Sequence, residues 1–218
     1  LFSLFSSMAA LRRLELRATE TTDARLALLK DHPKLEELVL TETRRAGRLV
    51  ADMLDLSRID SGLHIDWQPC DLAIIADQAR DRAEMLSPAI TIVRTGAATL
   101  PIVTDPQRVA QILANLTENA RRYTPDGGTV TIDLSRPGSH AEIMVSDTGP
   151  GVADAERERI FERLVRLDAA RTRDHGGAGL GLPIARGLAR ALGGNLTCLP
   201  RGPGAHFLLS LPVNRPTM

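Results

Sequence analysis

Aromatic side chains and cysteines are scarce in this chain of 218 residues. Phe, Trp and Tyr together supply 3% of the residues, so a core must be built mainly from Leu, Ile, Val and Ala, within a hydrophobic share of 43%. Cys70 and Cys198 are the only cysteines. Two cysteines are too few for an extracellular disulfide scaffold, so we expect a reducing compartment.

An excess of one charge and long apolar runs are also absent. Lys plus Arg and Asp plus Glu both number 27. A nucleic-acid binder usually has a basic excess, so we expect no nucleic-acid partner. No apolar run reaches the roughly 18 residues that cross a bilayer, and the start lacks the charged region of a signal peptide. We expect membrane contact only through segments absent from this chain, which opens inside a helical pattern like a piece of something longer.

The N-terminal part predicts a helical hairpin. One helix is expected over residues 1–31, a break over 31–34, and a second helix ending near Ser61–Gly62. The apolar positions of the second helix follow heptad-like steps, at Leu35, Val39, Ala46, Leu49, Met53 and Leu56. A lone hairpin cannot bury both faces, so pairing two hairpins into a dimeric four-helix bundle is predicted. The alternative is that the hairpin packs on its own C-terminal domain.

The remainder predicts an α+β fold, a two-layer α/β sandwich. Apolar periodicity and turn signals place helices at 71–86, 105–122 and 181–192, the second of them capped by Asp105 with Pro106 at its first position. Strands are expected at 90–95, 101–104, 129–135, 141–147, 195–200 and 205–211, with a Gly-Pro-Gly turn between the last two. Residues 153–165 are weakly helical in pattern, and 166–178 predict a mobile loop. We therefore expect two domains: a helical hairpin over 1–66 and a sandwich over 67–213.

Three polar segments in a fixed order point to a nucleotide and its metal. Asn115 and Asn119 lie four apart on one helix and so share a face, where an amide oxygen suits Mg²⁺ that also holds phosphates. Asp147 ends a strand, and a carboxylate there can accept a hydrogen bond from an exocyclic amine such as that of adenine. Taken alone, the asparagines also fit a solvated helix face, and Asp147 also fits a strand-end turn.

The third segment is glycine-rich. Gly176–Gly181 precedes a helix, and such approaches bind phosphate through free backbone N–H groups. The run is neither the dinucleotide fingerprint nor a P-loop, which would need Gly-Lys-Ser/Thr. Alone, it equally fits a flexible hinge. The three segments together, in this order, favour the nucleotide pocket over the separate structural explanations.

Residues 70–213 closely resemble the ATP-binding domain of sensor histidine kinases. The segment "NLTENARRYTPDGG" looks like their N box, "DTGPG" like their G1 box, "IFER" like their F box and "GAGLGL" like their G2 box. The helix that ends in "DLSRIDSG" resembles the second helix of their dimerisation and phosphotransfer domain. The resemblance covers nearly the whole chain.

The resemblance implies a role for each matching residue. Asn119 would ligate Mg²⁺ with Asn115 in support, and Arg122 and Arg166 would face the phosphates. Asp147 would read the adenine amine. Tyr123 would line the pocket, Gly149 and Gly151 would admit the ring, and Phe161 would anchor the lid. The lid hinge and the start of the phosphate-side helix would comprise Gly177, Gly179, Leu180, Gly181 and Leu182.

The resemblance also implies a reaction and its setting. The γ-phosphoryl of ATP would pass to a histidine and then to an aspartate of a response regulator, with ATP and Mg²⁺ as cofactors. Catalysis in such transfers is mostly positioning and charge neutralisation. The partners would be a second copy, through the N-terminal helices, and the response regulator. The chain would be the cytoplasmic portion of an inner-membrane sensor protein.

The acceptor histidine of the family is not found. The start "LFSLFSSMAALRRL" aligns with a pattern like "SHELRSPMAALRRL" after its eighth residue, which places Phe2 at the histidine and Ser3 at the neighbouring acid. Phe has no nucleophile and Ser is a poor general base. No histidine occurs before His32, which falls in the hairpin turn, so the phosphoacceptor stays unknown. His64, His140, His175 and His206 are expected to be linker, surface, packing or loop residues.

Three further functions compete with an autophosphorylating kinase core. The first is an ATP-binding, dimerising regulatory module without autophosphorylation, which the missing histidine favours. The second is a serine kinase of the anti-sigma type, against which the long hairpin argues. The third is an ATPase of the gyrase or chaperone class. Those proteins carry Glu-x-x-x-Asn in the N box, where the glutamate activates water, whereas Asn115 stands at the first position here.

Overall fold

The computed structural model describes residues 47, 49–165, 179–200 and 202–215. Contacts divide the chain into two compact units, Leu1–Ala51 and Asp52–Met218. The first predicted helix, its turn and the predicted four-helix bundle lie outside the described residues. Residues 49–60 are helical and a turn at 61–62 ends them, as predicted, with Gly62 at a φ of 90°. The domain boundary after residue 66 stays a prediction.

The second unit is built on a five-stranded sheet in the order β2-β4-β5-β7-β6. β2 pairs with β4 in parallel, and the other neighbours are antiparallel. The strands lie close to the ranges that alternation predicted, with bounds β2 Thr91–Gly96, β4 Thr129–Ser135, β5 His140–Asp147, β6 Asn195–Cys198 and β7 His206–Pro212.

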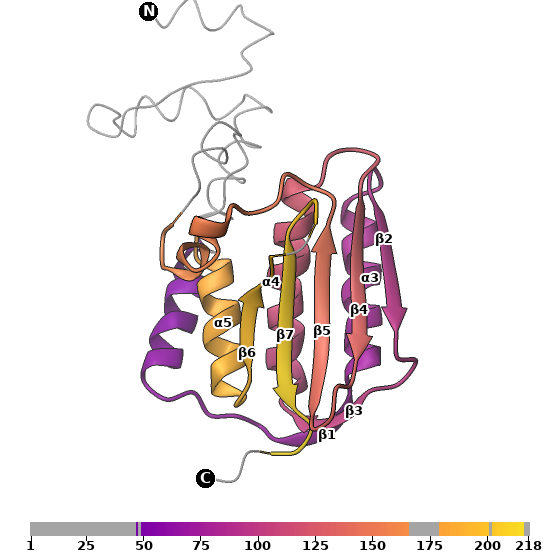
Figure 1. Ribbon diagram of the computed structural model, residues 1–218. Helices are drawn as coiled ribbons and strands as arrows, with labels where there is room; N and C mark the ends of the chain where they lie inside the picture. The colour runs from indigo at the N-terminus through magenta and orange to yellow at the C-terminus, as the bar shows by residue number, and fades with distance from the viewer. Residues whose placement is uncertain (1–46, 48, 166–178, 201, 216–218) are drawn as a thin grey trace, which may run out of the picture. The chain divides into compact units, whose positions relative to one another are not determined.

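Three helices cover one face of this sheet (Figure 1). They are α3 (Leu72–Leu86), α4 (Pro106–Tyr123) and α5 (Gly181–Ala191). Every second residue of β4 and β5 is buried, which is the pattern of a sheet with one covered face. The fully buried aliphatic and aromatic side chains come from both layers and include Leu113, Leu116, Ile132, Ile143, Leu188 and Phe207. The predicted two-layer α+β arrangement is confirmed for this unit.

A second sheet of two strands was only half predicted. β1 (Gln68–Asp71) pairs antiparallel with β3 (Pro101–Thr104). β3 was expected, but β1 was not. β1 is four residues long and contains Pro69, which cannot donate to a ladder and is tolerated at sheet edges. Only its pairing with a segment about thirty residues away makes it a strand.

Residues 153–165 form two short 3-10 turns rather than a continuous weak helix. These are η2 (Asp154–Glu156) and η3 (Arg159–Phe161). Ile160 and Phe161 are the buried residues of these turns, and they are adjacent in sequence. Adjacent apolar residues cannot form the stripe that holds an α-helix against a core.

Aspartates cap the two longer helices. The Asp71 Oδ1 accepts hydrogen bonds from the backbone N–H groups of Ala73 at 2.9 Å and Leu100 at 2.7 Å. The Asp105 Oδ1 accepts from the N–H groups of Gln107 and Arg108, as the predicted N-cap requires. Its Oδ2 accepts from the Asp66 N–H at 3.1 Å, which fastens the segment before β1 to the start of α4.

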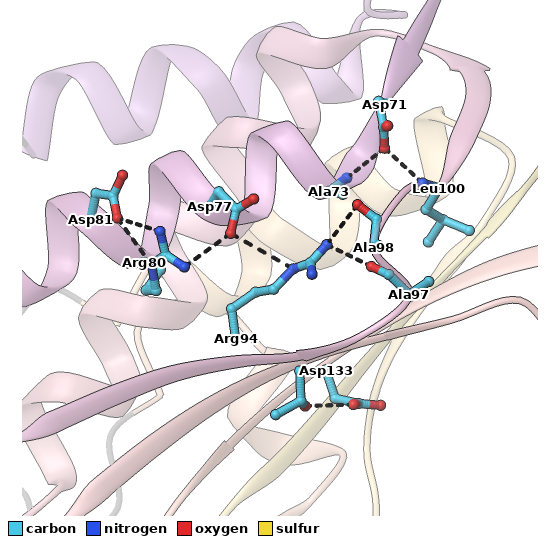
Figure 2. Close-up of polar contacts among 11 residues, drawn as sticks. Asp71, Ala73, Asp77, Arg80, Asp81, Arg94, Ala97, Ala98, Leu100 and Asp133 are labelled. Carbon is cyan, nitrogen blue, oxygen red and sulfur yellow. Dashed lines mark hydrogen bonds and ion pairs between the residues drawn. The ribbon is translucent and has the colours of Figure 1, made fainter.

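Arg94 of β2 holds the loop between β2 and β3 (Figure 2). Its Nη2 donates to the Ala97 carbonyl at 2.6 Å, and its Nε lies 3.7 Å from the Asp77 carboxylate of α3. Asp77 also pairs with Arg80 at 3.1 Å on the same helix. The Arg94 side chain is 13% exposed, so its charge is sheltered and this clamp joins the helix layer to the sheet layer.

Within the second unit, the helical residues before Gly62 contact α5 and the segment after the 3-10 turns. Leu56 is buried, and a Cβ added to Gly187 of α5 would lie 3.1 Å from the side chain of Ile59. Asp60 forms an ion pair with Arg163 at 2.7 Å. Met53 is exposed on the same helix. Among the described residues, no helix is both long and apolar enough to cross a bilayer.

Candidate functional site

The asparagines of the first segment lie on α4, on a face that is half-buried. Asn115 and Asn119 are one helical turn apart, and the residues between them on the core side are buried. The Asn115 Oδ1 lies 3.5 Å from the position that a Cβ on Gly181 would take. The middle of α4 therefore faces the first residue of α5, and two of the predicted segments meet there.

Glu118 lies beside Asn119 and carries two arginines. Arg121 pairs with its carboxylate at 2.8 Å, and Arg122 lies 3.6 Å from it. Arg121 also donates to the Ser87 hydroxyl at the end of α3. The guanidinium of Arg122, which was predicted to face the phosphates, therefore lies close to the Glu118 carboxylate, and its charge is partly balanced in this structure.

Asp147 is the last residue of β5 and is 4% exposed. Its Oδ1 accepts the N–H of Gly149 at 2.9 Å and the N–H of Ala205 at 3.2 Å. No hydrogen bond to its Oδ2 is found among the described residues. Burial raises the pKa of the carboxyl above the usual range of an aspartate, although the two N–H groups oppose that rise. One oxygen of a buried carboxylate is thus available for a donor.

The turn after Asp147 is fixed on both sides. The Thr148 hydroxyl accepts the N–H of Thr129, and the Thr148 N–H donates to the Thr129 carbonyl, so the turn is tied to β4. A Cβ on Gly149 would lie 2.5 Å from the carbonyl oxygen of Tyr123, the last residue of α4. Only glycine permits this approach, which brings the second predicted segment against the end of the first.

The turn between β6 and β7 packs against Asp147 from the other side. Gly204 has a φ of 90°, and a Cβ there would overlap the backbone carbonyl of Asp147. Gly151, at a φ of 76°, lies against the Gly204 carbonyl. A cavity of about 260 Å³ adjoins these turns; its lining comprises the 150–153 segment, the 202–205 segment, Arg157, Cys198 and Leu199. Gly151 is the one predicted nucleotide residue that lines it.

The third segment is described from Gly179 onward. Gly179 accepts a hydrogen bond from the Leu164 N–H at 3.1 Å through its carbonyl oxygen. Leu180 is buried, and Gly181 and Leu182 begin α5 and are half-buried. Arg166 and Gly177, both predicted site residues, lie outside the described residues, as do His32 and His175.

Phe161 belongs to the core rather than to an exposed flap. Its ring meets Phe207 of β7 edge to face, with centroids 6.3 Å apart, and the Arg186 guanidinium lies 4.6 Å from its centroid. Arg186 also pairs with Glu158 at 2.7 Å. These contacts attach the 3-10 turns to α5 and β7.

The histidines of the described part do not join the predicted nucleotide residues. His64 is exposed after the helical residues, and His140 opens β5 with Ser139 beside it. The His206 ring lies 2.9 Å from the Ser146 hydroxyl and 3.3 Å from the Pro203 carbonyl. A carbonyl oxygen only accepts, so the His206 Nε2 donates to Pro203 and braces the β6–β7 turn.

The predicted metal ligand is the amide oxygen of Asn119 rather than a cluster of carboxylates. Within the described ranges, no group of three or more His, Cys, Asp or Glu side chains is placed to hold a metal ion. Mg²⁺ usually keeps several waters and takes one or two protein ligands together with substrate phosphates. A single amide such as that of Asn119 is compatible with that kind of site.

The residues that sequence reasoning missed lie in the β6–β7 turn. Gly204 and Ala205 contact Asp147 although they follow it by almost sixty positions. The Gly-Pro-Gly sequence predicted a turn and nothing more. Only the antiparallel pairing of β5 with β7, which sets Ser146 opposite His206, brings that turn to the carboxylate.

Residues 104–215 match the family described as Histidine kinase-, DNA gyrase B-, and HSP90-like ATPase. The sensor-like histidine kinase SenX3 of Mycobacterium tuberculosis is 37% identical over 184 residues, which cover 83% of this chain and 45% of that protein. The chain thus spans less than half the length of this relative.

Two solved structures share the fold. The full-length protein ShkA, crystallised with AMPPNP, superposes with a TM-score of 0.68 and 30% identity, over 92% of this chain and 41% of that one. The mycobacterial sensor histidine kinase MprB gives a TM-score of 0.62 and 28% identity, over 68% of this chain and all of that one. This chain is similar to both proteins in fold and in sequence.

Proposed function

We propose that this chain, which belongs to the family of Histidine kinase-, DNA gyrase B-, and HSP90-like ATPases, is the kinase core of a two-component sensor histidine kinase. Its homologues are named sensor histidine kinases, and the resemblance found in the sequence is confirmed for the catalytic ATP-binding domain. The hairpin, the phosphotransfer steps and the partners belong to the proposal.

ATP binding is supported above all by the state of Asp147. A buried carboxylate costs free energy unless its oxygens are hydrogen-bonded. One oxygen has two donors and the other has none among the described residues. The exocyclic amine of adenine would supply the missing donor, whereas guanine presents a carbonyl at the corresponding ring position and would meet the carboxylate as a second acceptor. The pocket should therefore favour ATP over GTP.

The phosphate end is assigned to α4 and to the start of α5. The N-terminus of α5, at Gly181, faces Asn115, and free N–H groups at a helix start attract phosphate. Asn119 would hold Mg²⁺ with Asn115 in support, and the ion would neutralise phosphate charge. Arg122 is placed to exchange its ion pair with Glu118 for a phosphate contact, and Arg166 is proposed for the same end of the nucleotide.

The remaining predicted residues are proposed as the walls of the site. Tyr123 would line the pocket where its carbonyl meets Gly149, and Gly151 would admit the ring. Phe161 would anchor a lid, for which Gly177 and Gly179 provide the hinge. Leu180 and Leu182 would complete the nucleotide side of the α5 start.

The reaction proposed is transfer of the γ-phosphoryl of ATP to a histidine, followed by transfer to an aspartate of a response regulator. A homodimer formed through the N-terminal helices would supply the bundle, and the chain would be a cytoplasmic portion of an inner-membrane sensor. A second candidate is an ATP-binding regulatory module without autophosphorylation, because Phe2 stands where the alignment places the acceptor histidine.

Titration calorimetry with ATP and MgCl₂ tests the binding step. Asp147→Asn should weaken ATP binding by well over 1 kcal/mol, because it removes a charge-assisted hydrogen bond in a sheltered site. Asp133→Asn makes the same charge change on β4, where the carboxylate accepts a hydrogen bond from the Thr95 hydroxyl at 2.6 Å, and should leave affinity unchanged. Equal affinity of the wild type and Asp147→Asn would refute the adenine contact.

Incubation with γ-labelled ATP separates the two candidates. Acid-labile, base-stable label on the chain would identify phosphohistidine and eliminate the regulatory module. ATP binding without any such label, in a full-length preparation that dimerises, would favour the module over the kinase.

A further inference from the structure

The backbone ladder between β5 and β7 is broken at its last pair. Asp147 and Ala205 follow the paired residues Ser146 and His206. The Asp147 N–H donates to the Ala205 carbonyl at 3.0 Å. In a hydrogen-bonded antiparallel pair the reverse bond runs from backbone to backbone. Here the Ala205 N–H donates to the side-chain Oδ1 of Asp147 instead, at 3.2 Å.

The residue before Ala205 lies very close to the backbone of Asp147. Gly204 adopts a left-handed φ of 90° and approaches so closely that any Cβ would overlap the Asp147 carbonyl. His206, held between the Ser146 hydroxyl and the Pro203 carbonyl, braces the same turn on its other side. These contacts hold the β6–β7 turn against the end of β5.

The two hydrogen bonds to Asp147 determine which of its carboxylate oxygens is available to a ligand. A carboxylate can rotate and exchange its two oxygens unless donors select one. Gly149 supplies one donor, but Gly149 and Asp147 belong to the same local segment. Ala205 supplies the second donor from the distant β6–β7 turn, and together they hold Oδ1 and leave Oδ2 without a donor among the described residues.

We infer that the β6–β7 turn, through the Ala205 N–H, is a positioning element that orients Asp147 so that Oδ2 faces the exocyclic amine of the nucleotide base. The inference rests on the proposed ATP-binding function and extends it to residues outside the recognised motifs. The same N–H also lowers the pKa of Asp147 against the rise that burial causes. The turn therefore orients Asp147 and also favours its charged form.

The test replaces the Ala205 N–H by an ester oxygen. Cys198 allows a synthetic peptide for residues 198–218, with lactic acid at position 205, to be ligated to the rest of the chain. ATP and purine riboside triphosphate, which lacks the amine, are then titrated into the wild type and the ester variant. Ala205→Gly, made by the same ligation, keeps the N–H and serves as the matched control.

The wild type and Ala205→Gly should prefer ATP over the deamino analogue by roughly tenfold to a hundredfold, the range of one hydrogen bond to a charged group. The ester variant should lose most of that preference while binding the analogue as well as before. An equal loss for both nucleotides, or a preference kept in full, would overturn the inference. A wild type with no preference would refute the adenine contact itself, and a wild type that binds neither would refute the ATP site.

A second measurement needs no altered backbone. In protein labelled with ¹⁵N-alanine, the Ala205 amide resonance should follow the titration of Asp147 and should lose that titration in Asp147→Asn. An Ala205 amide that does not respond to pH in the wild type, or responds equally in Asp147→Asn, would show that its hydrogen bond to the carboxylate is not made.

Discussion

Asp71 and Asp147 form the same hydrogen bonds for different ends. Each is the last residue of a strand, β1 or β5. Each accepts, on Oδ1, the N–H of the residue two positions later and the N–H of a residue brought in by a neighbouring segment, Leu100 or Ala205. Their local geometry alone does not separate a structural aspartate from a ligand-binding one.

The surroundings make the difference. Asp71 is half-buried and is followed by α3, so its carboxylate caps a helix. Asp147 is nearly inaccessible and is followed by a glycine turn, so its carboxylate caps no helix and its pKa is raised by burial. The first arrangement stabilises the fold, and the second leaves one carboxylate oxygen without a donor among the described residues. A carboxyl group with a raised pKa is typical of functional sites.

The largest expected effect is the loss of stability in Asp71→Ala. The change removes an N-cap, worth about 1 kcal/mol, and leaves the Leu100 N–H without its partner, worth about 1–3 kcal/mol. Urea denaturation should show the unfolding free energy falling by about 2–4 kcal/mol. The preference for ATP over the deamino analogue should be kept. A change in that preference would mean that Asp71 is not only structural.

Asp147→Asn should give the opposite pattern. Its binding loss, about 1.5–3 kcal/mol for a charge-assisted bond, should exceed its loss of stability. Asn keeps an acceptor for the Gly149 and Ala205 N–H groups and removes a charge that burial disfavours. Calorimetry and denaturation on the same preparations measure both quantities. A stability loss as large as that of Asp71→Ala would make Asp147 a structural aspartate.

Arg94→Ala tests the polar clamp that lies near Asp71 (Figure 2). The variant loses the hydrogen bond to the Ala97 carbonyl and the sheltered contact with Asp77. The unfolding free energy should fall by about 1.5–3 kcal/mol, as for a hydrogen bond from a charged group. Nucleotide binding should not change. Weaker ATP binding would show that the β2–β3 loop and the nucleotide site are coupled.

The pH dependence should separate the two aspartates further. Because the folded pKa of Asp147 is raised, the folded state holds a proton that the unfolded state releases, and this contribution to stability is lost as pH rises from the ordinary aspartate range through the raised value. Asp147→Asn should lack this fall, so its stability relative to wild type should improve as pH rises across that window. Denaturation at a series of pH values measures the difference; parallel curves would contradict the raised pKa.

The smallest effect is expected at the ion pair between Asp60 and Arg163. Both side chains are more than half exposed, and such pairs contribute about 0–1 kcal/mol. Asp60→Ala should therefore shift the unfolding free energy by less than about 1 kcal/mol. A larger loss would mean that the helical residues before Gly62 are held in place chiefly by this pair rather than by the burial of Leu56 and the contact of Ile59 with Gly187.

Much of the second unit could be predicted because its signals are local. The Asp105 cap followed by Pro106 predicted the start of α4, and strict alternation predicted β4 and β5. β1 and the two 3-10 turns were missed because their conformations depend on pairing and packing with distant residues. The sequence segments with glycine and asparagine indicated the site, but the contacts made by Gly204 and Ala205 carry no local signal.

By itself the sequence determined the order of most helices and strands, the family resemblance and the residue types of the proposed nucleotide site, since these follow from periodicity, turn chemistry and short motifs. The tertiary structure alone decided that Asp147 presents one engaged oxygen and one available oxygen. That outcome depends on a turn almost sixty residues later being set beside it by the β5–β7 ladder. Strand pairing at such a separation is governed by the packing of the whole sheet and not by any segment alone.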